Sequence, residues 1–228
     1  MTLKQIVDRL LQLDTACICD AEKALDTGLR VMSPQLRPVG SGVRMAGPAH
    51  TIRCHNDFLA VIQGLIDAVA GEVLVIDSQA STKAVTGELF PTEAMRKGLA
   101  GIVNDGPCRD VATVREMEFA YFARSVSCIP GTTVDLGETQ VPILCGGVVV
   151  RPGEVVFGDD DGLMVASAEQ FATLIPVAEE IQAAESRLLE QMSAGRPLID
   201  MLNFREHCDR LRKGEPTKLS FVVEPRKY

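Results

Sequence analysis

Residues 72 to 124 alternate between short apolar runs and amphipathic segments, and this alternation constrains the fold more than any other feature. The apolar runs have the length and composition of buried strands. Strands that alternate with helices in this way build a largely parallel sheet covered by helices, so we expect an α/β fold. The expected strands are 72–77, 101–105 and 120–124, and the expected helices are 88–97 and 110–118.

The flanking segments predict the remaining elements. Ser167 and Gln170 match a capping box that opens a long helix to about Ala194, and residues 141–165 read as short strands joined by Gly and Pro turns. We expect one domain over 1–195 and a C-terminal extension, 196–228, packed on that domain or on a neighbouring subunit. Further helices are expected at 2–13, 19–25, 57–66 and 198–208, turns and an edge strand over 33–48, and a strand in the tail segment KLSFVV.

Charge and composition argue against several classes of partner. The net charge is −8 and the pI is near 5.0, whereas nucleic-acid binding depends on clustered cations. The longest apolar stretch, Ile143 to Val150, is interrupted by two glycines and is far shorter than a membrane span. The seven cysteines include no C-x-x-C pair, which is typical of reduced thiols. We therefore expect a cytoplasmic protein that acts on a small molecule, without nucleic acid or membrane.

Two predicted loop-to-helix junctions contain the candidate site residues. Familiar signatures such as the P-loop, G-x-G-x-x-G, H-E-x-x-H and G-x-S-x-G are absent from the sequence. At the first junction, Gly87 and Glu88 precede a helix start at which the amides of Leu89 and Phe90 could hold a carboxylate. At the second junction, Arg109 could bind a carboxylate bidentately, and Asp110 offers a hard oxygen ligand for Mg²⁺ or Mn²⁺.

Each of these residues also has an ordinary structural interpretation. Asp110 at a helix start is commonly an N-cap, Glu88 complements the helix dipole, and Arg109 alone is a typical surface cation. Cys108 could be an activated thiol or, more commonly, a buried apolar side chain. Glu185 interrupts the apolar stripe of the long helix, so it is a partnered buried charge, part of a site, or an exposed charge.

The combination of motifs resembles the RraA-like family, named after the regulator of ribonuclease E activity A. The resemblance covers roughly residues 14 to 195 and is most specific in GELF, RKGLAGIVNDG and the following Arg-Asp pair. In the metal-dependent aldolase branch of this family, an acidic residue is followed after twenty intervening residues by an Arg-Asp pair. Glu88 and the pair Arg109-Asp110 resemble the branch in this spacing. Further similarity lies in RPVGSGVRMAGPAHTI and VVVRPGEVVFGDDDGLMV. The resemblance implies an α/β/α sandwich of the swivelling phosphohistidine-domain type, assembled as a homotrimer or a dimer of trimers.

The resemblance also implies roles for individual residues. Asp110 would bind Mg²⁺ or Mn²⁺ directly, and Glu88 and Asp20 would hold the metal's waters, as would Glu185 from a neighbouring subunit. The amides that follow Gly87, those of Leu89 and Phe90, would grip the pyruvyl carboxylate together with Arg109. This chain departs from the family at two positions, with Glu88 in place of Asp and Asp20 in place of Glu, and these changes affect the water shell.

The implied reaction is the retro-aldol cleavage of 4-hydroxy-2-oxo dicarboxylic acids to release pyruvate. This is the chemistry of the 4-hydroxy-4-methyl-2-oxoglutarate and 4-carboxy-4-hydroxy-2-oxoadipate aldolases. Oxaloacetate decarboxylation passes through the same enolate and should accompany it. The alternatives are a non-catalytic protein that binds and inhibits a ribonuclease, and a methyltransferase, for which the sequence has no glycine-rich cofactor loop.

Overall fold

The computed structural model describes residues 1–221, which divide into two compact units. The first unit runs from Met1 to Ala178, and the second begins at Glu179. The helix α6 (Ala168–Ser193) contributes residues to both units. The expected domain limits, 1–195 and 196–228, stay a prediction.

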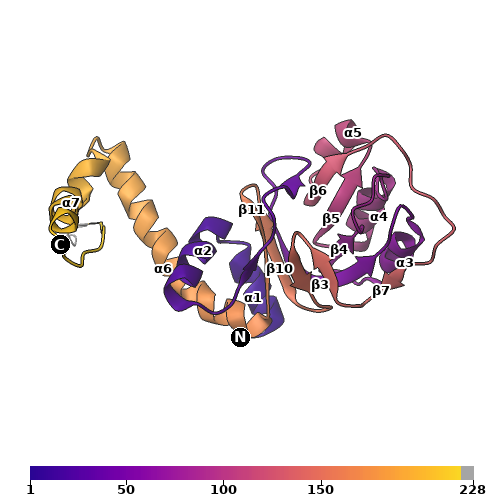
Figure 1. Cartoon of the computed structure of the whole chain (residues 1–228), viewed down its shortest axis with the longest axis horizontal. Helices are drawn as coiled ribbons and strands as arrows, with labels where there is room; N and C mark the ends of the chain where they lie inside the picture. Colours follow the sequence, from indigo (N-terminus) through magenta and orange to yellow (C-terminus); the bar gives the residue numbers. More distant parts are fainter. Residues whose placement is uncertain (222–228) are drawn as a thin grey trace. The chain divides into compact units, whose positions relative to one another are not determined.

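A single curled sheet forms the framework of the first unit (Figure 1). Within residues 1–221 its strand order is β1-β11-β10-β3-β4-β5-β6-β2, and β7 pairs with β3. The four strands β3, β4, β5 and β6 run parallel, as the alternating pattern predicts. Their carboxyl ends therefore lie at one edge of the sheet. The strands are β1 (Arg30–Val31), β2 (Arg37–Pro38), β3 (Met45–Arg53), β4 (Val73–Asp77), β5 (Gly101–Cys108), β6 (Tyr121–Val126), β7 (Glu138–Thr139), β10 (Val155–Asp159) and β11 (Gly162–Ala166).

The two faces of the parallel strands are covered differently. In β4, Leu74 and Ile76 pack in a core cluster with the helices α3 (Leu59–Asp67), α4 (Leu89–Lys97) and α5 (Val111–Arg115). The alternate residues of β4, Val73 and Val75, belong to the cluster on the other face. That face is covered by the hairpin β8 (Ile143–Cys145) and β9 (Val148–Val150). The helices α1 (Leu3–Leu10) and α2 (Thr15–Leu25) contact the β3 and β10–β11 part of the sheet, so the mixed α/β prediction is confirmed.

The segment 33–48 differs from the expectation of turns and one edge strand. The short strand β2 does lie at the sheet edge, but Met45 begins β3, which occupies the sheet interior. The expectation rests on the prolines and glycines of this segment, and proline cannot donate to a central ladder. In the structure, β3 pairs with β10 through Pro48 and with β4 from Ala49 onward. Pro48 thus sits where the strand changes partner, and this position tolerates its missing N–H.

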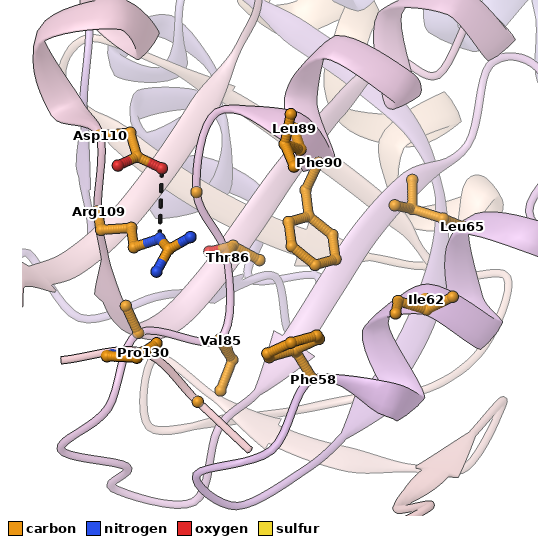
Figure 2. Close-up of a pocket in the computed structure, with 13 residues that line it drawn as sticks. Phe58, Ile62, Leu65, Val85, Thr86, Leu89, Phe90, Arg109, Asp110 and Pro130 are labelled. Atoms are coloured by element: carbon orange, nitrogen blue, oxygen red, sulfur yellow. Dashed lines mark ion pairs between the residues drawn. The ribbon is translucent and has the colours of Figure 1, made fainter. Parts of the chain in front are cut away.

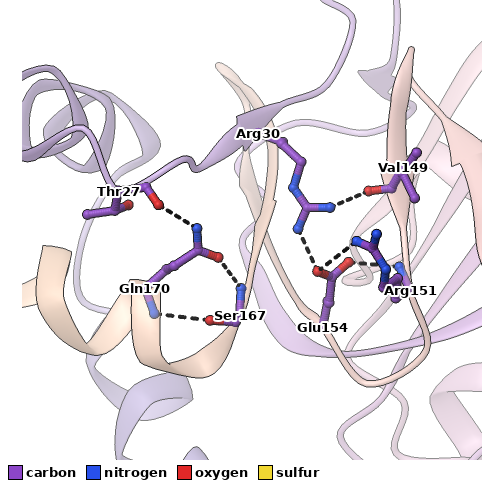
Figure 3. Close-up of polar contacts among 7 residues, drawn as sticks. All are labelled: Thr27, Arg30, Val149, Arg151, Glu154, Ser167 and Gln170. Carbon is purple, nitrogen blue, oxygen red and sulfur yellow. Dashed lines mark hydrogen bonds and ion pairs between the residues drawn. The ribbon is translucent and has the colours of Figure 1, made fainter.

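The capping box at the start of α6 forms as predicted (Figure 3). The Ser167 amide donates to Gln170 Oε1 at 2.8 Å, and the Gln170 amide donates to Ser167 Oγ at 3.2 Å. Gln170 Nε2 also donates to the carbonyl of Thr27 at 2.7 Å, which ties the helix start to the loop after α2. The long helix is confirmed over 26 residues.

Other helix limits shift by a few residues. The helix α1 ends at Leu10 instead of Leu13, α2 begins at Thr15 instead of Cys19, and α5 is shorter than the expected 110–118. In the second unit, a 3-10 turn (Leu198–Met201) precedes α7 (Phe204–Arg212). Phe221 of the predicted tail strand forms an isolated bridge with Leu202, and the last residues of KLSFVV lie outside the described residues. No helix in residues 1–221 is both long enough and apolar enough to cross a membrane.

Candidate active site

The two predicted junctions meet at the carboxyl end of β5. Thr86 forms a parallel bridge with Cys108, and the Arg109 amide donates to the Thr86 carbonyl at 3.1 Å. This pairing brings Gly87 and the start of α4 beside Arg109 and Asp110. In open α/β sheets ligands bind outside the carboxyl ends of the strands, which is where these residues lie.

Asp110 occupies the position before α5 but does not cap the helix. Its backbone is left-handed, with φ 57° and ψ 32°, and its side chain makes no capping hydrogen bond. The carboxylate instead accepts a hydrogen bond from the Glu88 amide, at 3.2 Å from Oδ2. Arg109 Nε lies 3.3 Å from the same oxygen. The interpretation of Asp110 as a plain N-cap is therefore wrong, because the carboxylate faces the start of α4.

The contact between the Asp110 carboxylate and the Glu88 amide depends on a glycine at position 87. A Cβ at position 87 would collide with Asp110 Oδ2 and would lie 3.0 Å from Arg109 Cγ. The Arg109 and Asp110 side chains are partly exposed, so a side chain at position 87 would displace them from the start of α4. The glycine allows the Asp110 carboxylate to reach the Glu88 amide.

A buried network of polar side chains contacts Thr86, the residue before Gly87. The Thr86 hydroxyl accepts a hydrogen bond from Asn104 Nδ2 at 3.0 Å and contacts the Tyr121 hydroxyl. Burial raises the pKa of Tyr121 above its usual range, so the phenol stays protonated. Burial also raises the pKa of the Cys108 thiol, and Cys108 is fully buried. This favours the interpretation of Cys108 as a structural residue over that of an activated thiol.

A cavity of about 310 Å³ opens in front of the Arg109–Asp110 pair (Figure 2). Figure 2 shows this pair on one side and the side chains of Ile62 and Leu65 on the other. The rings of Phe58 and Phe90 meet edge to face, with centroids 6.1 Å apart. The lining residues are Phe58, Ile62, Leu65, Ala84, Val85, Thr86, Gly87, Leu89, Phe90, Arg109, Asp110, Pro130 and Gly131.

The apolar side of this cavity was not predicted. Phe58, Ile62 and Leu65 follow a helical spacing that reads as an ordinary core face. In the structure Ile62 is 39% exposed and lies at the cavity. Pro130 reaches the cavity from a loop 20 residues after Asp110, and no local sequence signal points to it.

The predicted site residues are only partly brought together. Gly87, Leu89, Phe90, Arg109 and Asp110 all line the cavity, and Glu88 contributes its amide to Asp110. The Phe90 amide is not free as expected, because it donates to the Gly87 carbonyl at 3.2 Å. This bond closes a tight first turn of α4.

Two further predicted acids lie elsewhere. Asp20 is exposed on α2 and is not among the residues that line the cavity. Glu185 is exposed on α6 in the second unit. Their roles toward the waters of a metal stay predictions.

The donor set of the cavity suits a hydrated cation held by few protein ligands. In residues 1–221 no group of three His, Cys, Asp or Glu side chains is placed to hold a metal. A cage built wholly of such side chains therefore does not form within the described chain. Mg²⁺ commonly keeps several waters and binds through one or two carboxylates. The Asp110 carboxylate, with its side chain 36% exposed at the cavity, fits this role.

Residues 15–165 match the family model described as RraA-like, Aldolase/RraA. The chain belongs to the RraA-like family. A relative from Halalkalibacterium halodurans, provisionally named 4-hydroxy-4-methyl-2-oxoglutarate aldolase, is 34% identical over 75% of this chain and 80% of its own length.

Solved structures share the fold, and one of them is named RraA. An uncharacterized protein from Pseudomonas syringae pv. tomato superposes with a TM-score of 0.74 at 26% identity, over 86% of this chain and 96% of that one. The RNA-processing inhibitor RraA from Thermus thermophilis superposes with a TM-score of 0.60 at 30% identity, over 65% of this chain and 90% of that one. The family thus includes proteins named for an enzymatic activity and one named for inhibition.

Proposed function

We propose that this RraA-like protein is a divalent-metal-dependent pyruvate aldolase that cleaves 4-hydroxy-2-oxo acids and also decarboxylates oxaloacetate. The observation that carries the proposal is the orientation of Asp110. Its carboxylate leaves the helix start uncapped and lies beside Arg109 at the edge of a cavity of substrate size. A cation and a carboxylate paired at one end of an apolar cavity suit a ligand with a charged head.

Arg109 is the residue we assign to the substrate carboxylate. Its planar guanidinium can hold a carboxylate through two parallel hydrogen bonds, and its side chain lines the cavity. Asp110 would hold Mg²⁺ or Mn²⁺, with Glu88 ordering the surrounding waters. The bound cation would supply Lewis-acid stabilisation of the charge that develops on the keto oxygen.

The bond changes follow from the chemistry of the substrate. The C4 hydroxyl loses its proton and becomes a carbonyl as the C3–C4 bond breaks, and its electron pair forms the pyruvate enolate. Protonation of that enolate releases pyruvate. The residues that line the cavity include no histidine, so a water at the cavity mouth beside Arg109 would accept the hydroxyl proton.

We also propose that the active protein is a cytoplasmic homotrimer or dimer of trimers. Glu185 would act at a neighbouring subunit's site, and Asp20 would join the same water shell. Mixing Arg109→Ala and Glu185→Ala subunits after dissociation should regenerate about a quarter of the intact sites in a cyclic ring. Demonstrably mixed oligomers that recover no activity would contradict the assignment of Glu185.

The alternative is a non-catalytic protein that binds and inhibits a ribonuclease, in keeping with the name of the Thermus relative. One assay separates the two functions. Pyruvate release from oxaloacetate and several 4-hydroxy-2-oxo acids should require Mg²⁺ or Mn²⁺ and should stop with EDTA. If turnover of every compound stays at the uncatalysed rate with either metal, the aldolase proposal fails and inhibition of a ribonuclease becomes the function to test.

A further inference from the structure

The strand β5 is irregular just before the second junction. Asn104 and Pro107 both pair with β6, and β5 contains one residue more than β6 between these two pairs. Such bulges redirect the chain and are common beside active sites. On the β4 side, the Ser78 hydroxyl donates to the Asp105 carbonyl at 2.7 Å, and a Cβ at Gly106 would collide with Ser78 Oγ. The bulge is therefore held from β4, and it leads directly into the second junction.

The Asn104 side chain spans this bulge and also reaches the first junction. Its Nδ2 donates to the Pro107 carbonyl at 2.9 Å and to the Thr86 hydroxyl at 3.0 Å. Pro107 precedes Arg109 by two residues, and Thr86 directly precedes Gly87. The amide group of one fully buried side chain thus ties the two junctions together.

Asn104 is a polar residue in an apolar part of the strand. The flanking β5 residues Ile102 and Cys108 belong to the core cluster that packs against α3, α4 and α5. Among residues 1–221, no group pairs with the buried Asn104 Oδ1. An unpaired buried acceptor is destabilising, and an apolar side chain of the same shape would avoid this cost. Asparagine is therefore not the most stabilising choice here, which indicates that its two donated bonds serve the position of the junctions.

From these contacts we infer that Asn104 is a positioning residue that fixes the two junctions against each other. The inference rests on the proposed aldolase function, in which Arg109 holds the substrate carboxylate and Asp110 holds the metal. The Glu88 amide of the first junction orients the Asp110 carboxylate. A shift of about 1 Å between such groups can lower a rate about 100-fold. Both junctions belong to one chain, so the inference holds whichever groups a neighbouring subunit adds to the site.

Asn104→Leu tests the inference with little change in side-chain size, because it removes both donated bonds and the unpaired oxygen. We expect kcat for pyruvate release with Mg²⁺ to fall at least about tenfold while KM changes less than about threefold, since the binding groups stay and only their alignment is lost. Tyr121→Phe is the matched control. It removes a hydroxyl from the same buried network, leaves both Asn104 bonds in place, and should keep kcat and KM close to those of the wild type.

Hydrogen exchange gives a readout that does not depend on activity. The Arg109 amide donates to the Thr86 carbonyl at 3.1 Å, and the Glu88 amide donates to Asp110 Oδ2 at 3.2 Å. Both bonds join the two junctions, so both amides should exchange at least about tenfold faster in Asn104→Leu through local opening. The amides of β10 and β11, which lie on the other side of β3 in the sheet, should exchange as in the wild type.

The outcomes separate the inference from the proposed function. If Asn104→Leu matches Tyr121→Phe in kcat and in the exchange of both amides, the inference is wrong and the aldolase function stands. Faster exchange throughout the chain, with kcat per folded molecule unchanged, would show a role in stability alone and would also overturn the inference.

If the wild type releases no pyruvate with either metal, the aldolase function fails, and the exchange of the two amides decides whether Asn104 positions the junctions. Should Asn104→Leu fail to fold, Asn104→Ser takes its place in both measurements, because serine can make at most one of the two bonds.

Discussion

Asp14 and Asp110 occupy the same position relative to a helix, and the structure uses them in opposite ways. Asp14 precedes α2 with an extended backbone, φ −102° and ψ 161°, and its Oδ1 accepts a hydrogen bond from the Cys17 amide at 2.7 Å. Asp110 precedes α5 with a left-handed backbone, and its carboxylate turns to the Glu88 amide of another segment. One aspartate stabilises its own helix, and the other does not.

The proposed role of Asp110 as a metal ligand accounts for this difference. A left-handed backbone at a residue other than glycine costs of order 1 kcal/mol and persists where the surrounding structure enforces it. At position 110 this cost directs a carboxylate to a cavity beside Arg109. Asp14 shows what the same residue type does when a helix cap is its role.

The largest effect is expected from Asp110→Asn. Asparagine tolerates the left-handed backbone and caps helices about as well as aspartate, so the fold should persist. The change removes the anionic ligand and should lower metal-dependent kcat/KM at least about 100-fold, since even outer ligands of metal sites contribute 10- to 100-fold. Pyruvate release at saturating Mg²⁺ checks this, with Asp14→Asn as the control that should retain activity. Full activity of Asp110→Asn would show that Asp110 is not a required metal ligand.

Arg109→Lys should cost roughly 100-fold in kcat/KM. Lysine keeps the positive charge but lacks the planar fork that holds a carboxylate bidentately. Most of the loss should occur in KM for the 2-oxo acid, whereas the metal requirement should stay. A wild-type KM in Arg109→Lys would exclude Arg109 as the carboxylate ligand.

Gly87→Ala should lower activity by about tenfold or more with a smaller effect on stability. The added methyl group collides with Asp110 Oδ2, so the carboxylate must leave the Glu88 amide. Loss of 1 Å of positioning can cost about 100-fold in rate. Gly153→Ala is a suitable control for the folded state, because a Cβ there meets no atom within 4 Å although the backbone φ is +79°. Equal kinetics of Gly87→Ala and wild type would show that the close contact has no function.

Asp14→Ala should lower the free energy of unfolding by about 1 kcal/mol, the usual contribution of a helix N-cap. Urea denaturation measures the change, and pyruvate release per folded molecule should be unaffected. A comparable loss of stability in Asp110→Ala would remove the distinction between the two aspartates, since Asp110 makes no cap to lose.

The smallest effect is expected from Asp110→Gly, which should leave the protein equally stable or up to about 1 kcal/mol more stable. Glycine adopts the left-handed region without the steric cost of a Cβ, although it adds entropy to the unfolded chain. The same variant should be inactive. Marked destabilisation by Asp110→Gly in urea denaturation would mean that the Asp110 side chain holds the junction together.

The sequence predicts well those parts of the molecule that depend on local patterns. The strands β4 and β5, the helix α4 and the capping box of Ser167 and Gln170 all follow from periodicity and neighbouring residues. The loop-to-helix junctions that contain Gly87 and Arg109 are likewise found from short segments of the sequence. These features require only short segments to be read in isolation.

The features of the site that the sequence does not predict depend on contacts between segments that are distant in the chain. The left-handed backbone of Asp110 arises because Thr86 pairs with Cys108 and presents the Glu88 amide. Pro130 reaches the cavity through a loop whose position is set by hydrogen bonds to Asp57 and Ala84. The helical spacing of Ile62 predicts a buried core position. Only the structure shows that its side chain is partly exposed at the cavity.

Titration with Mn²⁺ tests most directly whether the Asp110 carboxylate is a metal ligand and not a helix cap. Calorimetry or electron paramagnetic resonance would be applied to the wild type, Asp110→Asn and Asp14→Asn, each confirmed as folded by circular dichroism. We predict one Mn²⁺ site per chain in the wild type and in Asp14→Asn, and binding at least about tenfold weaker in Asp110→Asn. Unchanged Mn²⁺ affinity in folded Asp110→Asn would contradict the account.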